Sequence, residues 1–177
     1  SNKTKYARSM VVSTIPRMCT FPSFLRSMYT FGDINVSVFI KPIGENASQT
    51  ELNRRINEIE SERIVAAERG NINRERILAQ KRLETEELRD SIASGFNKLF
   101  ESSVVATLFA YSLDDLDKQT ELLASEMSKT MIGVKPAWAM QEEAYNSNMP
   151  YCENRIKKNH TFDRNSMATV FPFFNSD

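Results

Sequence analysis

The chain has 177 residues, of which 41% are hydrophobic and 26% are charged. A chain of this length forms one domain, or one domain with an attached subdomain, and this composition allows a real apolar core. Its 23 Lys and Arg residues balance 23 Asp and Glu residues. The formal net charge of zero excludes a global field that would favour nucleic acid or an acidic membrane. No apolar run approaches the ~20 residues of a membrane helix.

The first 46 residues have the pattern of a strand, a short helix and a second strand. Residues 10–15 are rich in β-branched side chains and end at Pro16, which predicts a strand. Thr20 or Ser23 can cap the helix that follows, which closes near Gly32. Apolar and other residues then alternate from 34 to 40, which predicts a strand that buries Ile34, Val36, Val38 and Ile40 and turns Phe39 outward.

Residues 47–100 predict a helical hairpin. They contain no proline, and apolar residues recur at helical spacing over 52–59 and again over 88–99. Gly70-Asn71 is typical of a helix end, because both residues tolerate a left-handed backbone. The second helix is predicted to be capped near Asn73 and to run to about Phe100, with Phe96 on its apolar stripe.

The two ends of the predicted hairpin differ in composition. The apolar stripe is confined mainly to the base, whereas residues 63–87 are dominated by mixed charges. A tip of this kind cannot bury much area against a globular core, so we expect it to project into water and to be free to meet a partner. The candidate partner contacts are its arginines: Arg63, Arg69, Arg74, Arg76 and Arg82.

After the hairpin, residues 104–111 are apolar on both faces, which suits a central strand. A helix beginning at Leu113 is predicted to bury Leu116, Thr120, Leu123, Met127 and Met131. Residues 134–139 predict a strand, which Pro136 places at an edge of the sheet. Trp138 is expected in the core, with an exposed anchor for a partner as the alternative. A short helix is expected over 141–148, and the remainder is expected to be loop-rich.

The order of these elements predicts the α+β class. Without the hairpin the pattern is βαβ followed by βαβ, which matches a ferredoxin-like split βαβ sandwich. In this arrangement the hairpin is inserted between the second and third strands. The expected organisation is an α+β sandwich formed by 1–46 and 101–140, an inserted hairpin at 47–100, and a loop-rich segment at 141–177.

The sequence contains none of the searched motifs for catalysis, cofactors or metals. Neither the P-loop pattern GxxxxGK[ST] nor the dinucleotide pattern GxGxxG occurs. His160 is the only histidine, and we expect an ordinary surface residue in a loop. Cys19 and Cys152 are far apart and are expected to be free thiols. We therefore predict no catalytic, cofactor-binding or metal-binding residue, and no enzyme activity for this chain.

The ends of the chain suggest an excised part of a longer protein. It begins at Ser1-Asn2 without methionine and stops directly after an apolar cluster. Such a cluster is too apolar to leave exposed, so it either packs back or contacts a following domain. The candidate interdomain contacts are Phe171, Phe173 and Phe174.

Several segments together resemble the N-terminal region of the CagE/TrbE/VirB family of conjugative type IV secretion ATPases, in versions found on Gram-positive conjugative elements. The strand at 33–40 after Asp33, the charged helical stretch 47–100 and the Leu-Asp start at 113–117 are similar to that family. So are the Asn148-Met149-Pro150 step and the run 164–173, which resembles the segment before the nucleotide-binding domain. No residue here matches the family's Walker motifs.

The resemblance implies a non-catalytic docking or assembly domain of a conjugative DNA-transfer ATPase. It further implies that ATP and Mg²⁺ bind in a C-terminal domain that follows, and that the full-length protein self-assembles. It implies a cytoplasmic location at the periphery of the cytoplasmic membrane, where other secretion-channel components are the partners.

Two other readings come from the residues alone. One is a nucleic-acid-binding module that uses the basic N-terminal segment and the 155–158 loop with Arg155, Lys157 and Lys158. The other is a coiled-coil adaptor, which requires the hairpin to self-associate.

Overall fold

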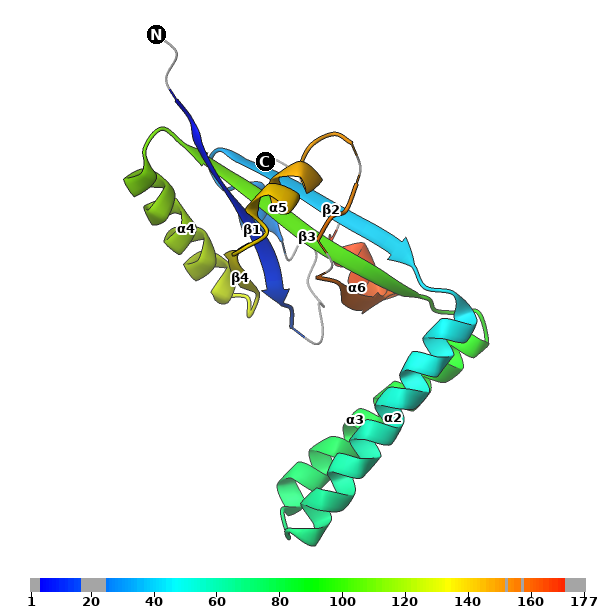
Figure 1. Ribbon diagram of the computed structural model, residues 1–177. Coiled ribbons are helices and arrows are strands. Elements are labelled where there is room, and N and C mark those ends of the chain that lie inside the picture. The colour runs from blue at the N-terminus through cyan, green and yellow to red at the C-terminus, as the bar shows by residue number, and fades with distance from the viewer. Residues whose placement is uncertain (1–3, 17–24, 152, 157, 171–177) are drawn as a thin grey trace, which may run out of the picture. The chain divides into compact units, whose positions relative to one another are not determined.

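The computed structural model (Figure 1) describes residues 4–16, 25–151, 153–156 and 158–170, and the following account concerns these residues. They form five strands and six helices, so the predicted α+β class is confirmed. The chain divides into two compact units, Ser1–Lys41 with Glu101–Asp177, and Pro42–Phe100.

The first unit is built on an antiparallel sheet in which β2 (Ile34–Pro42), β3 (Leu99–Ala110), β1 (Tyr6–Thr14) and β4 (Gly133–Pro136) lie in this order. Strand β1 pairs with β3 from Tyr6 opposite Ala110 to Val11 opposite Val105. It pairs with β4 on its other side, with an irregularity between Val12 and Thr14. Strand β5 (His160–Asp163) also pairs with β3. The central strands β3 and β1 therefore form hydrogen bonds to neighbouring strands along both of their edges.

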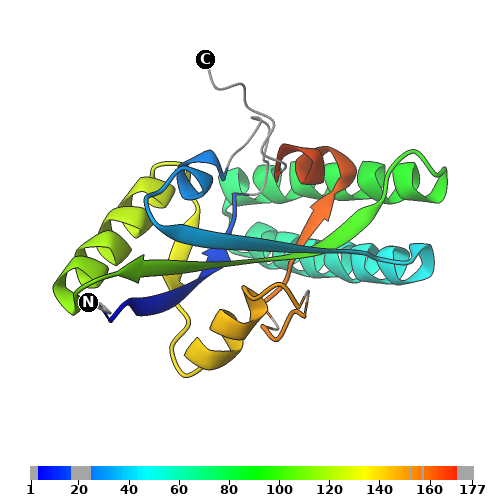
Figure 2. The same cartoon turned by 90° about the horizontal axis from the view of Figure 1, so that it is seen from above.

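Neighbouring residues of β1 contact helices on opposite faces of the sheet. Arg8 donates to Thr120 of α4 (Leu113–Ser128) at 3.1 Å and forms an ion pair with Asp117 at 2.7 Å. The backbone of Ser9 instead exchanges two hydrogen bonds with Gln141 at the start of α5 (Gln141–Ser147), at 2.8 and 2.9 Å. Figure 2 shows α5 on one face, with α1 (Arg26–Tyr29), α4 and α6 (Arg164–Val170) on the other.

The apolar pattern of α4 is confirmed except at its end. Leu116, Thr120, Leu123 and Met127 are buried, and Ser112 caps the helix by accepting the Asp115 N–H at 3.1 Å. Met131, which was expected to continue the stripe, is 75% exposed and has a φ of 59°. Because the helix has already ended, Ile132 occupies the buried position in its place.

Trp138 and Phe39 were both assigned to the wrong environment. Trp138 is 72% exposed, because the turn after β4 places Ala137 in the core instead. Phe39, expected to point outward, packs against a buried cluster formed by Val11, Val105, Ala137, Ala144 and Ile156. Phe39 is covered because α5 contributes Ala144 to the same cluster. Ile40, which was expected to be buried, is 49% exposed near the end of the edge strand β2.

The chain after residue 150 contains regular structure that the sequence did not predict. Strand β5 buries Phe162, and α6 buries Met167 and Val170. Asp163 accepts the backbone N–H of Ser166 at 3.1 Å at the start of α6. His160 belongs to β5 and is half-buried, with Nε2 3.0 Å from the carbonyl oxygen of Val12, so it is not a loop residue.

The second unit is a helical hairpin of α2 (Glu45–Glu68) and α3 (Ile72–Ala93). Gly70 lies in the turn with a φ of 66°, and the Asn71 side chain accepts the Arg74 N–H at 3.1 Å. The cap is therefore Asn71 and not Asn73. Helix α3 ends at Ala93 and not near Phe100, because Gly95 takes a left-handed φ of 77° and leaves Phe96 exposed. Strand β3 accordingly starts at Leu99, five residues before the predicted start.

Two apolar clusters hold the hairpin together. The one at the base contains Leu52, Ile92 and Leu99, with Ile43 and Leu88 packed against it. The other contains Ile59, Ala66 and Leu78, and it extends toward the turn. The charged half therefore has a small apolar cluster of its own between the two helices, in which Leu78 is only 5% exposed.

Candidate partner-binding surface of the helical hairpin

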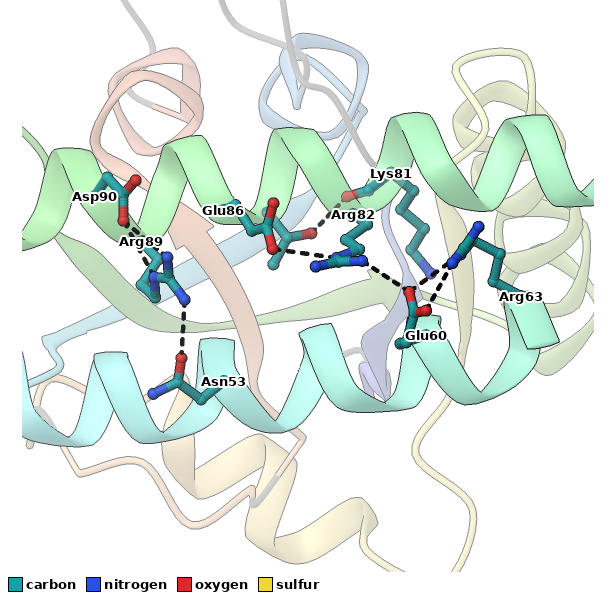
Figure 3. Close-up of polar contacts among 9 residues, drawn as sticks. Asn53, Glu60, Arg63, Lys81, Arg82, Glu86, Arg89 and Asp90 are labelled. Carbon is teal, nitrogen blue, oxygen red and sulfur yellow. Dashed lines mark hydrogen bonds and ion pairs between the residues drawn. The ribbon is translucent and has the colours of Figure 1, made fainter.

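Glu60 is the centre of a polar network between the two helices of the hairpin (Figure 3). Its carboxylate accepts two hydrogen bonds from Arg63 of the same helix, at 2.8 and 3.1 Å. It also accepts one from Arg82 of α3 at 3.0 Å. The hydrogen bond from Arg63 is the main cause that lowers the pKa of Glu60. One carboxylate thus joins a turn of α2 to the middle of α3.

Further ion pairs connect the two helices. Arg63 lies 3.5 Å from Glu75, and Arg74 lies 3.4 Å from Glu62, so both pairs cross from one helix to the other. Arg82 also pairs with Glu86 one turn later at 3.1 Å. Partly exposed pairs add little stability, but each cross-helix pair fits only one register of the two helices. The network therefore specifies how the helices align.

The five arginines predicted as partner contacts fall into three groups. Arg63 and Arg82 are engaged within the hairpin and are about a third exposed. Arg74 makes one long contact, to Glu62. Arg69 and Arg76 form no ion pair with any residue that the structure describes. These two guanidinium groups are the ones available to an outside anion.

A hollow of about 370 Å³ lies at the turn end of the hairpin. Val65, which is 43% exposed, supplies apolar surface there, and Arg69 and Arg74 supply positive charge. Glu62 is the acidic residue of the lining and is already paired with Arg74. An apolar side chain next to a carboxylate would fit this combination. The complete lining is Ser61, Glu62, Val65, Ala66, Arg69, Asn71 and Arg74.

The basic residues considered for nucleic-acid binding are largely neutralised where they are described. Lys5 pairs with Asp33, which is the main cause that raises the pKa of Lys5. Arg8 pairs with Asp117, as described above, and Arg155 pairs with Glu153 at 2.8 Å. Lys158 is exposed, and Lys157 lies outside the described residues. Of the basic residues described in these two segments, Lys5, Arg8 and Arg155 therefore have acidic partners.

Several other predicted residues lie outside the described part of the chain. These are the candidate interdomain contacts Phe171, Phe173 and Phe174, and the two cysteines, Cys19 and Cys152. Within the described ranges, no three His, Cys, Asp or Glu side chains are grouped so that they could hold a metal ion. No helix there has the length and apolar character needed to cross a membrane.

Sequence reasoning missed the hollow and the role of Glu60. Glu60 and Arg63 are three residues apart, a spacing that brings two side chains together on a helix. The contact between them could therefore be predicted from the sequence. The contact from Arg82 depends on the alignment of α2 with α3, which no local pattern specifies.

Comparison with known proteins was made against protein-family models and curated protein sequences. Neither comparison gives a match. The function proposed below is therefore argued from the residues and from the resemblance described above.

Proposed function

We propose that this chain is a docking and assembly domain of a conjugative type IV secretion ATPase of the CagE/TrbE/VirB type. The hairpin tip is the contact surface. The observation that carries this proposal is the hollow beside Val65, with Arg69 unpaired among the described residues at its rim. Arg76 is a second cation that forms no ion pair with the described residues, and it lies at the same end of the hairpin but outside the lining of the hollow. A surface segment of another channel component with an acidic and an apolar side chain is the ligand that fits.

The proposed fold is a ferredoxin-like split βαβ sandwich with the hairpin inserted between its second and third strands. The strand order β2-β3-β1-β4 with antiparallel neighbours supports it. Helices α1 and α4, each of which joins two strands, lie on the same face of the sheet (Figure 2). In the element order, α2 and α3 stand between β2 and β3.

The domain itself is proposed to be non-catalytic. ATP and Mg²⁺ would bind in a C-terminal domain, and the full-length protein would self-assemble in the cytoplasm at the periphery of the cytoplasmic membrane. The absence of a P-loop pattern from the sequence supports this assignment. Hydrolysis of Mg-ATP by the purified chain above a buffer blank would contradict it.

Reversing the two available charges tests the docking surface. We expect Arg69→Glu with Arg76→Glu to lower conjugative transfer from donor cells by about tenfold or more, because charged contacts at the centre of an interface contribute strongly to binding. The hairpin should stay folded, since neither guanidinium forms an ion pair within the described chain. Transfer frequency is measured with the variant gene replacing the original, and protein levels are checked by immunoblot.

Arg54→Glu is the matched control. Arg54 is an exposed arginine at the base of the same hairpin, where it pairs with Glu51 at 2.8 Å. Its reversal changes the charge of α2 without touching the hollow and should leave transfer unchanged. Equal loss of transfer in both variants would reject the tip as the docking surface.

Fluorescence anisotropy of labelled DNA and RNA at low salt tests whether the chain binds nucleic acid. We expect the anisotropy to stay constant as the chain is added.

A further inference from the structure

The outer edge of β2 is long and unprotected. Strand β2 has nine residues and stands at the end of the sheet order, and no other described strand pairs with its outer edge. Every residue from 34 to 42 is half-buried or exposed. Natural edge strands are commonly blocked by charges, proline, bulges or short length. Residues 34–40 contain no charged residue and no proline.

The opposite edge of the same sheet has these protections. Strand β4 is four residues long and contains Lys135 and Pro136. Its pairing with β1 is irregular between Val12 and Thr14. Strand β2 also contains a lysine and a proline, but these are its last two residues, Lys41 and Pro42. The seven residues before them form the longest stretch without charge or proline at either edge of the sheet, so β2 is the edge better suited to accept another strand.

The register of β2 identifies the backbone groups that face outward. The N–H of Phe109 bonds to the carbonyl of Asp33 at 3.0 Å, and the N–H of Ile43 bonds to that of Leu99 at 2.9 Å. Ten residues separate the two bonds on each strand, so the ladder has one register throughout. Because hydrogen bonding alternates along an antiparallel strand, odd-numbered residues bond to β3. The N–H and C=O groups that point away from the sheet belong to Ile34, Val36, Val38 and Ile40.

A hollow lies beside this edge. A hollow of about 720 Å³ lies along residues 34–40 and is bounded by Ser147–Pro150 at the end of α5. The hollow follows the strand over all seven of these residues. An added strand would lie about 4.8 Å from β2, the ordinary spacing within a sheet.

From these observations we infer that β2 pairs with β2 of a second copy of this chain, antiparallel about a two-fold axis at Ser37. This register places Ile34 opposite Ile40 and Val36 opposite Val38, so the outward-facing groups meet as hydrogen-bonded pairs. It also places Asp33 opposite Lys41 of the partner subunit, twice by symmetry. Residues 33–41 are thus complementary to themselves in charge as well as in backbone pattern. Asp33 pairs with Lys5 of its own chain, so in the dimer its carboxylate would lie between Lys5 and the partner's Lys41.

Sedimentation equilibrium of the purified chain and its charge variants tests this inference. We expect the unmodified chain to dimerise. Lys41→Asp places two carboxylates opposite each other across the interface, and Asp33→Lys places two lysines opposite each other. Each variant alone should dissociate roughly tenfold more readily, because like charges on directly opposite residues destabilise paired strands. An equimolar mixture of the two variants should recover the dimer, because both cross-strand pairs then carry opposite charges.

Backbone-directed measurements add a second readout. Val36→Pro removes an outward N–H and should abolish the dimer while keeping the bonds to β3. Amide exchange by NMR should show protection on dimerisation at the even-numbered residues 34–40 only. Lys135→Asp makes the same charge change on the protected edge strand and should leave the dimer unchanged.

The inference is overturned by a monomer at every concentration, or by a dimer that Lys41→Asp and Val36→Pro both leave intact. A dimer lost only on substitution of the exposed hairpin residue Ile77 by Glu would assign association to the hairpin instead. Because β2 and the hairpin tip are different surfaces, failure here leaves the proposed docking function standing.

Discussion

Tyr29 connects two short helices of the first unit. Its hydroxyl group donates to the carbonyl oxygen of Val170 at 2.9 Å, joining the end of α1 to the end of α6. Burial raises the pKa of Tyr29 to about 12. The phenolate is disfavoured in the folded chain, because a charge there would lose its hydration and the hydroxyl group would lose its proton for Val170.

This pKa shift predicts a loss of stability at alkaline pH. Since the folded pKa is the higher one, the contribution of Tyr29 is complete below pH 10 and is lost as the pH rises from 10 toward 12. The loss should reach up to about 2 kcal/mol. Tyr29→Phe should lower stability by about 1 kcal/mol at pH 7 and remove this part of the alkaline loss. Urea unfolding of both proteins at pH 7, 10 and 11.5 measures the difference, and parallel pH profiles would contradict it.

Gly70 is the residue on which the hairpin turn depends. Its φ of 66° is left-handed, and a Cβ added there would meet nothing within 4 Å. Gly70→Ala should therefore cost only the backbone strain, about 1 kcal/mol. Gly44 also has open space around it but an ordinary φ of −62°, so Gly44→Ala is the matched control and should cost less. Thermal unfolding of the two variants compares them; an equal loss at both sites would reject the strain argument.

At the scale of elements, the hairpin is held by apolar contacts and aligned by polar ones. Its helices are strongly polar, yet Leu78 lies in a cluster with Ile59 and Ala66 that is almost closed to solvent. Buried area of this kind stabilises a helix pair far more than exposed ion pairs do. This cluster could not be predicted from the sequence, because its members come from two helices and neither helix has a continuous apolar stripe.

Two leucines of α3 separate these contributions. Leu78→Ala should lower the free energy of unfolding by about 2–5 kcal/mol, because it leaves a cavity between the helices. Leu83→Ala, at a site that is 55% exposed, should change it by about 0.5 kcal/mol or less. Denaturant unfolding followed by far-ultraviolet circular dichroism measures both. Similar losses for the two variants would mean that the tip cluster does not stabilise the hairpin.

At the scale of the whole molecule, the elements before residue 150 were predictable and those after it were not. Strand β2, the hairpin and α4 follow from alternation or helical spacing, and β1 and β3 follow from runs of β-branched or apolar residues. The short elements α1, β4 and α5 were also expected from the sequence. Strand β5 has four residues, including the polar His160 and Thr161, which is too short for a period to be visible. Its pairing with β3 depends on contacts between residues far apart in the sequence, which a local pattern does not contain.

The candidate site was predictable only as a region. Charge density marked residues 63–87, but it did not separate Arg63 and Arg82, which bind Glu60, from Arg69 and Arg76, which form no ion pair with the described chain. That distinction depends on which face of α2 meets α3. Trp138 illustrates the same limit, because its exposure is decided by the turn after β4 and not by its own apolar character.

The contacts around Glu60 have a mechanical consequence. Sliding α3 by one turn, about 5.4 Å, would separate Arg82 from Glu60 and Arg63 from Glu75 together, and would also withdraw Leu78 from its cluster. All three losses oppose the same motion. The two helices should therefore move as one rigid pair when a partner displaces the turn. The displacement should reach residues 42 and 100 through both helices together.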